Sequence, residues 1–409
     1  MNIACILAGT NYPLFADRTV YGLRLVERLQ RQFHEFKFDE VLFISDLPSP
    51  VENISSKSIP ELSRFLQNLD LQQDIRLFLV RSNVIVDDRL IKFMRESKED
   101  LQLTEHGGFV KLSGSNLEVF VHHLSQVKDM GQLIDFTKKQ PDSFSIKIVT
   151  PNNFDSYIED LRLNFVPYYF QYESDSDLRS IENQMYEANF KGTMDFIATY
   201  IYKYPVREIT RFLSRYPSVK PNYITFLSIV ASFAVPLLFA LGYMGLAVLT
   251  GWCMFIFDSV DGKLARLTVR LSRTAGIIEH ATSAPAIFLW FAGLTWHFAD
   301  GQFFAFDNIN TIAGWTLMIL YWVDKTMCGI FRIKFKREIY DFAIIDKTFH
   351  LIACRRAIIL LIVTVGYIAG KTESSFRFLA FWMVCSFVFH LLRIIWISAR
   401  ISKSNSHQT

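Results

Sequence analysis

Two carboxylates and an arginine stand where a long uncharged stretch of the chain ends. Residues 222–257 contain no Asp, Glu, Lys or Arg, and the segment Asp258-Ser-Val-Asp261-Gly262-Lys-Leu-Ala265-Arg266 follows directly. On a helix, Asp258, Asp261 and Ala265 share one face, because side chains three and four positions apart are neighbours. Carboxylate oxygens are the ligands that Mg²⁺, Mn²⁺ and Ca²⁺ prefer, and a guanidinium binds phosphate. The segment therefore predicts a site for a divalent cation and a charged substrate at the end of an apolar helix.

The composition separates a soluble first half from a membrane-embedded second half. The chain has 409 residues, of which 51% are hydrophobic and 15% aromatic. Residues 1–185 have the composition of a soluble domain, whereas beyond about residue 222 apolar runs of membrane-spanning length follow one another. The net charge of +3 is too small to indicate a nucleic-acid partner. The five cysteines are scattered without a CxxC pair, which indicates neither a zinc site nor a disulfide framework.

Strand and helix patterns alternate in the first domain, which we assign to residues 1–185. Buried strands are predicted at 2–7, 41–45 and 75–80, and helices at 20–36, 63–69 and 87–95. This alternation predicts an α/β domain with a mostly parallel sheet. The polar segment 172–189 is expected to be a connector, and residues 186–220 a linker with an amphipathic juxtamembrane helix.

The second half is predicted to be an all-α, six-helix transmembrane bundle over residues 221–400, followed by a short tail, 401–409. The expected spans are 222–241, 243–262, 276–298, 309–330, 352–370 and 376–398. The first two are separated only by Gly242-Tyr-Met-Gly245, so they require a tight turn. Basic residues concentrate in 258–273 and 331–356, while the loop 298–308 has none. By the positive-inside rule we expect an integral protein of the inner or plasma membrane, with both termini and the Asp258 segment cytoplasmic.

The charged segment resembles the signature of the CDP-alcohol phosphotransferase family, also called CDP-alcohol phosphatidyltransferases, which reads D-x2-D-G-x2-A-R-x8-G-x3-D-x3-D. Its first half is met by Asp258, Asp261, Gly262, Ala265 and Arg266. The segment Pro221-Asn-Tyr-Ile-Thr225 is similar to the PNxIT sequence that precedes the first span in that family. The resemblance covers about residues 190–400.

The second half of the signature can be aligned in two registers. In the first, Ala275 takes the glycine position, Glu279 the third carboxylate and Ser283 the fourth. In the second, Gly276 is the glycine, and His280 and Ala284 take the carboxylate positions. We favour the first register, because it aligns Ser272 with a common family serine and retains a carboxylate. Neither register supplies the fourth aspartate.

The resemblance implies an activity and a role for each matching residue. Asp258, Asp261 and Glu279 would bind Mg²⁺ or Mn²⁺, while Gly262, Ala265 and Arg266 would shape the site for a CDP-alcohol donor. A phosphoalcohol group would pass to an alcohol acceptor with release of CMP, a step of phospholipid biosynthesis; a homodimer is the family's usual assembly. The alternative function is that of a catalytically impaired member that binds ligands or acts as a scaffold in the membrane.

The residues that would act on the acceptor are less defined. Ser283 stands where the family has its proposed base, and His280 is the neighbouring group whose pKa suits proton transfer. The alternative for His280 is a packed or interfacial polar residue. Arg355 and Arg356 match a region that binds the phosphate of phosphorylated acceptors in the family; their alternative role is anchoring at the cytoplasmic membrane surface.

The first domain resembles a nucleotidyltransferase in its opening strand, Ala8-Gly9, the helix after Tyr21 and the second strand. The family's G-x-G-x-R loop is absent from Gly9-Thr-Asn-Tyr-Pro13. Val80-Arg-Ser82-Asn83 has no carboxylate where the family places a metal-binding aspartate, and Asp87 and Asp88 come a turn later. The combination is similar to bifunctional inositol-phosphate cytidylyltransferase/di-myo-inositol-phosphate-phosphate synthases, here with an eroded first site.

Overall fold

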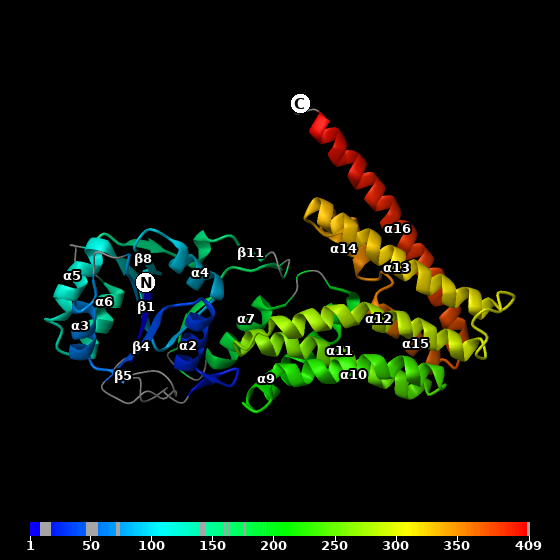
Figure 1. Cartoon of the computed structure of the whole chain (residues 1–409), viewed down its shortest axis with the longest axis horizontal. Helices are drawn as coiled ribbons and strands as arrows, with labels where there is room; N and C mark the ends of the chain where they lie inside the picture. Colours follow the sequence, from blue (N-terminus) through cyan, green and yellow to red (C-terminus); the bar gives the residue numbers. More distant parts are fainter. Residues whose placement is uncertain are drawn as a thin grey trace. The chain divides into compact units, whose positions relative to one another are not determined.

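The computed structural model describes residues 1–8, 18–45, 56–70, 74–139, 144–158, 161, 163–172, 174, 177–190, 192 and 194–406 (Figure 1). Of these, the side chains of His280 and of residues 401–406 lie outside the description. The chain divides into two compact units. Unit 1 comprises Met1–Gly192, Arg211–Pro217 and Arg266–Arg270, and unit 2 comprises Thr193–Thr210, Ser218–Ala265 and Leu271–Thr409.

A seven-stranded sheet forms the centre of unit 1, in the order β10-β8-β9-β6-β1-β4-β5. The central strand β1 (Asn2–Leu7) pairs in parallel with β4 (Glu40–Ile44) and β6 (Arg76–Arg81). Strand β9 (Phe109–Ser113) runs antiparallel to both of its neighbours, β6 and β8 (Leu101–Leu103). The outer strands β5 (Ser56–Lys57) and β10 (Lys147–Val149) are again parallel to their partners. The predicted α/β domain is therefore present, with a mixed sheet.

Helices cover both faces of this sheet because its strands are buried on both sides. Ala4 and Ile6 of β1 belong to one apolar cluster, and Ile3, Cys5 and Leu7 belong to the other. The first cluster includes residues of α2 (Leu25–Glu35) and α4 (Asp88–Glu96). The second includes residues of α3 (Ile59–Gln67), α5 (Gly114–Leu124) and α6 (Met130–Lys138). Alternation along a strand thus explains the two layers of helices.

Smaller elements complete unit 1. They are β2 (Thr19–Val20), β3 (Leu23–Arg24), β7 (Val84–Val86), η1 (Pro151–Asn153), β11 (Tyr157–Ile158), β12 (Leu163–Asn164) and β13 (Tyr169–Gln171). The segment expected to be a connector instead contains helix α7 (Leu178–Ala188), with Ile181, Met185 and Tyr186 buried. Its Glu182 accepts a 2.7 Å hydrogen bond from Arg211. These apolar side chains at helical spacing explain why the segment packs into unit 1.

Unit 2 is helical. Its elements are α8 (Phe196–Tyr200), α9 (Lys203–Ser214, whose last turn belongs to unit 1), α10 (Pro221–Ala240), α11 (Met244–Leu267), α12 (Arg273–Phe298), α13 (Ile309–Phe335), η3 (Ile339–Asp341), α14 (Ile344–His350), α15 (Arg356–Ile368) and α16 (Thr372–Ser406). The predicted tight turn between the first two spans is present, with Gly242 at φ +80°. A glycine is required there, because a Cβ would lie 2.8 Å from the His297 ring.

Four helices among the described residues are long and apolar enough to cross a membrane: α10, α11, α12 and α16. We therefore describe the chain as a membrane protein. The predicted bundle of six spans is not confirmed. Helix α15 has 13 residues, about 20 Å of helix, which is shorter than the hydrocarbon core of a bilayer. Helix α13 has 27 residues, but Asp324, Lys325 and several other polar residues interrupt its apolar sequence.

Candidate active site

The carboxylates of the signature lie in the last turns of α11, which continues without a break to Leu267. The Asp261 residue is 2% exposed, and the Asp258 side chain is 14% exposed. Gly262, Ala265 and Arg266 follow on the same helix, with Arg266 assigned to unit 1. The spacing predicted from the sequence is therefore realised on one helix. A buried aspartate needs compensating partners, and neighbouring helices provide them.

Helix α10 contributes a hydroxyl to Asp261. Pro221 occupies the first turn of α10, where its missing N–H costs nothing, and Thr225 follows one turn later. The Thr225 Oγ1 donates a 2.6 Å hydrogen bond to Asp261 Oδ2, and both residues are buried. The other oxygen, Oδ1, accepts a 2.5 Å hydrogen bond from the Gly262 backbone N–H. These two bonds fix the orientation of the carboxylate. The sequence of the PNxIT segment does not indicate this role of Thr225.

Helix α15 contributes a guanidinium to Asp258. Arg356 Nη2 lies 3.0 Å from Asp258 Oδ2, and its guanidinium sits 5.8 Å from the centre of the Phe255 ring. Arg355 precedes α15 and bonds instead to the His350 ring; its guanidinium lies 5.9 Å from the Tyr340 ring centre. The two adjacent arginines predicted to bind a phosphate therefore have different partners. Only Arg356 contacts a signature carboxylate.

Helix α12 carries the second half of the signature. Ser272 is its N-cap, and its side chain accepts a hydrogen bond from Ala275 N at 3.3 Å. Glu279 and Ser283 are half-buried and one turn apart on the same face. His280 belongs to the helix, but its side chain lies outside the described residues, so its predicted role as a base stays a prediction.

The carboxylates fit a divalent cation by donor type and by burial, because they offer hard oxygen atoms in a largely water-excluded setting. However, within the described part of the chain, Asp258, Asp261 and Glu279 do not form a group whose ligand atoms all lie within 4.8 Å of one another. Asp258 and Asp261 instead bind Arg356 and Thr225. The three-carboxylate ligand set stays a prediction.

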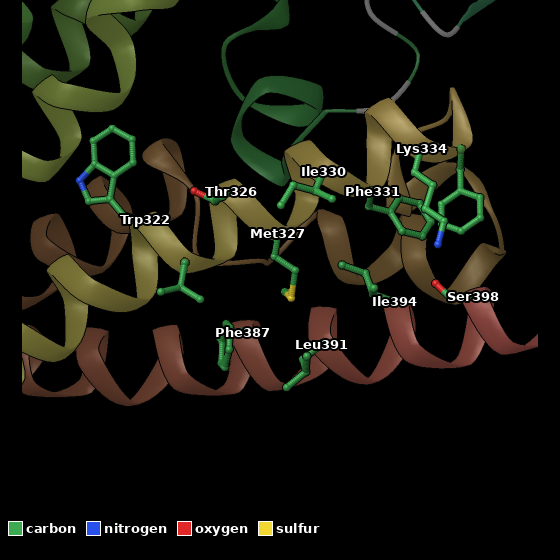
Figure 2. A pocket seen from close by; sticks show the side chains of 12 residues that line it. Trp322, Thr326, Met327, Ile330, Phe331, Lys334, Phe387, Leu391, Ile394 and Ser398 are labelled. Atoms are coloured by element: carbon green, nitrogen blue, oxygen red, sulfur yellow. The ribbon is translucent and has the colours of Figure 1, made fainter.

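A large apolar groove lies elsewhere, between α13 and α16. It has a volume of about 660 Å³, and Figure 2 shows side chains of both helices in the space between them, among them Met327, Phe387 and Leu391. None of the predicted site residues lines it. Apart from Lys334 and the hydroxyls of Thr326 and Ser398 its lining is apolar, and it contains no carboxylate, imidazole or thiol for metal binding. The groove therefore does not mark the site of the signature residues.

In unit 1, the resemblance places a nucleotide site at the end of β6, but the charged residues near this end bind other protein groups. Arg81, at the end of β6, donates a 2.9 Å hydrogen bond to Thr137 Oγ1, and burial lowers the pKa of its guanidinium. Asp87 caps α4 and pairs with Arg89 at 2.9 Å. The predicted turn at Gly9-Thr-Asn-Tyr-Pro13 lies outside the described residues. The nucleotidyltransferase resemblance of this unit is not confirmed.

Comparisons with known proteins find solved structures that resemble part of this chain. No family model matches the chain, and no curated protein matches it. Mycobacterium tuberculosis phosphatidylinositol phosphate synthase (PgsA1) with CDP-DAG bound is 21% identical, with a TM-score of 0.36 over 46% of this chain and 92% of that chain. The same enzyme in complex with manganese and citrate is 22% identical, with a TM-score of 0.37 over 46% of this chain and 88% of that chain.

Proposed function

We propose that the protein is a membrane-embedded transferase that moves a phosphoalcohol group from a CDP-alcohol to an alcohol acceptor and releases CMP. The observation that carries the proposal is the buried aspartate pair at the end of α11, held by Thr225 from α10 and Arg356 from α15. This pair belongs to the sequence that matches the first half of the family signature. Three helices thus position groups suited to a metal-bound pyrophosphate.

Asp258, Asp261 and Glu279 are the proposed ligands of Mg²⁺ or Mn²⁺, and a bound cation would neutralise negative charge on the CDP pyrophosphate. Thr225 and the Gly262 N–H hold the Asp261 carboxylate in one orientation, which reduces the reorganisation needed when ligands bind. Gly262 and Ala265 are small residues, and they are the proposed positions at which the CDP group approaches α11 closely. Arg266, in the last turn of α11, is the proposed contact for a donor phosphate.

The acceptor hydroxyl would attack the β-phosphorus, forming a new P–O bond as the bond to CMP breaks. Its proton would pass to His280, since the Ser283 hydroxyl has no proton affinity to accept it near neutral pH. Arg355 and Arg356 are proposed to bind the phosphate of a phosphorylated acceptor. We further propose that residues 1–185 and the charged end of α11 face the cytoplasm.

The test is CMP release by the full-length protein purified in detergent, supplied with Mg²⁺ or Mn²⁺, a CDP-alcohol and an acceptor. Metal-dependent release that Asp261→Asn abolishes is the expected result. The substitution His280→Ala is expected to lower turnover by about 10²–10⁴-fold, the usual cost of losing a general base. Unchanged turnover in this variant would remove His280 from the mechanism.

A second candidate function is a catalytically impaired relative that binds CDP-alcohols without transferring their phosphoalcohol group. The observation that favours it is Ser283 at the position of the fourth carboxylate. This candidate predicts saturable, metal-dependent binding of a CDP-alcohol together with no CMP release for any donor and acceptor pair. Equilibrium binding of a labelled CDP-alcohol, measured on the same preparation, separates the two functions.

A further inference from the structure

Two ionisable residues face each other from the apolar helices α13 and α16. Asp324 lies in the middle of α13, and His390 lies in the part of α16 that is apolar and long enough to cross a membrane. The two helices pack against each other (Figure 1). Ionisable side chains in such helices are costly, and they usually mark a binding or functional site. Neither residue belongs to the signature or to the site proposed above.

A thiol completes a compact group with these two side chains. Cys328 is one turn from Asp324 on the same face of α13, and each of the three residues places one potential ligand atom within 4.8 Å of the others. His390 Nδ1 lies 2.8 Å from Asp324 Oδ1, and the two side chains are 12% and 22% exposed. Within the described residues, no other group of three His, Cys, Asp or Glu side chains is this compact.

Aromatic neighbours hold the His390 ring in place, whereas the Cys328 thiol has no hydrogen bond to a described residue. The His390 ring packs edge-on against the Phe349 ring of α14, with ring centres 5.9 Å apart, and Phe349 stacks on Phe389. The half-buried Cys328 thiol makes no hydrogen bond with any described residue. An aspartate–histidine pair alone would explain the 2.8 Å contact. It does not require the Cys328 sulfur, which packs against the apolar cluster of Phe331, Ile339 and Ile397, to lie within 4.8 Å of both partners.

We propose that Asp324, Cys328 and His390 bind one Zn²⁺ ion, which joins α13 to α16. Imidazole nitrogen, thiolate sulfur and carboxylate oxygen are the donor types that zinc prefers, and three protein ligands leave a fourth position for water or a substrate. Ligand atoms around a tetrahedral zinc lie about 3.3–3.7 Å apart, so small side-chain movements bring these three into range. With the thiol ionised and the imidazole neutral, the ligands carry two negative charges that balance Zn²⁺, which suits an apolar setting.

This site differs in chemistry from the carboxylates of α11, so the two metals are distinguishable. Asp258 and Asp261 offer oxygen alone and suit Mg²⁺ or Mn²⁺, whereas a thiolate ligand selects against these hard cations. The zinc proposal does not depend on the proposed transferase activity. Cysteine spacing along the chain did not indicate it, because His390 comes from a different helix.

The first measurement is zinc content. Full-length protein in detergent is stripped with a chelator, incubated with Zn²⁺ and dialysed, and bound zinc is measured by mass spectrometry. We expect one equivalent in the wild type and an affinity at least about 10-fold lower in Cys328→Ser, His390→Gln and Asp324→Asn. The matched controls are Cys385→Ser, which removes a different half-buried thiol, on α16, and His297→Gln on α12. Both controls and Asp261→Asn should keep the full equivalent.

Substitution with Co²⁺ shows whether the thiol is a ligand. A thiolate-to-cobalt charge-transfer absorption band is expected in the wild type and in Cys385→Ser, and it should be absent from Cys328→Ser. Cys328→His restores a ligand without sulfur, so it should regain zinc but show no such band; this result also excludes misfolding as the cause of the loss. Equal zinc content in all variants, or a band that survives Cys328→Ser, would overturn the proposal and leave Asp324 and His390 as a hydrogen-bonded pair only.

Discussion

Asp258 and Asp324 are both carboxylates on helices of unit 2, yet neighbouring helices surround them with different chemistry. Asp258 pairs with the Arg356 guanidinium, and Asp261, on the same face of α11, accepts a bond from the Thr225 hydroxyl. Asp324 meets the imidazole of His390 and lies beside the Cys328 thiol. The first group suits phosphates and hard cations, and the second suits zinc. The difference shows that an aspartate in an apolar helix acquires its chemistry from the helices packed against it.

The largest effect expected from this comparison is at Asp261. Asp261→Asn keeps the shape of the side chain but removes a charge and weakens the proposed metal site. CMP release should fall at least about 10²-fold, because even partners that merely orient metal ligands contribute 10–100-fold. The measurement is the initial rate of CMP release across a range of Mg²⁺ concentrations. If CMP release stays low at high Mg²⁺ while the variant still binds one zinc, the carboxylates of α11 and the zinc ligands act independently. Loss of both CMP release and zinc would show that the two sites are coupled.

Arg356 and Arg355 provide a matched pair of neighbouring arginines. Arg356→Gln leaves the largely buried Asp258 without its guanidinium and should lower the rate of CMP release by about 10–10²-fold. Arg355→Gln leaves the Arg356–Asp258 pair in place and removes the guanidinium that contacts the His350 and Tyr340 rings. Because Arg355 is a proposed contact for the acceptor phosphate, we expect a raised KM for a phosphorylated acceptor with little change in kcat. Steady-state kinetics of both variants measure the split. Equal decreases in the rate of CMP release for both variants would contradict the conclusion that Arg356 alone supports Asp258.

An effect no larger than that of Arg356→Gln is expected at Thr225. Thr225→Val keeps the branched shape but removes the hydroxyl that donates to Asp261; a hydrogen bond to a charged group is worth about 1.5–3 kcal/mol, so CMP release should fall about 10–10²-fold at most. The control is Thr316→Val, whose exposed hydroxyl bonds to Ile312 O of its own helix. Rates within twofold for both variants would show that the Thr225 hydroxyl does not position Asp261.

The smallest effect is expected on the folding of unit 1, which should stay intact in every variant. The reactivity of the buried Cys5 thiol tests this. Burial in the sheet raises the pKa of the Cys5 thiol from 9.0 to about 12. Burial favours the neutral thiol, so its contribution to stability is complete below about pH 9 and is lost as the pH rises toward 12. Maleimide should therefore label Cys5 slowly at pH 7–8 in native protein and rapidly after unfolding, as followed by peptide mass spectrometry. Rapid labelling in an inactive variant would assign its loss of activity to unfolding.

The sequence alone determined the local features of this chain. Hydrophobic runs located β1, β4 and β6 to within one residue at each end, because a buried parallel strand is defined by its own side chains. The spacing of Asp258, Asp261 and Ala265 placed them on one helical face, because helix geometry depends only on the distance along the chain. The turn at Gly242 was predicted because two spans must share the uncharged stretch 222–257, which leaves only a few residues to connect them.

The tertiary structure alone decided which partner each of these groups meets. Arg355 and Arg356 are adjacent and chemically identical in sequence, yet only Arg356 reaches Asp258, 98 positions away. Asp324 and His390 are 66 positions apart, and no sequence pattern connects them. The antiparallel β9 and the short α15 were also missed. Hydropathy and periodicity record how one segment is buried, whereas the chemistry of a buried charge depends on which other segments pack beside it.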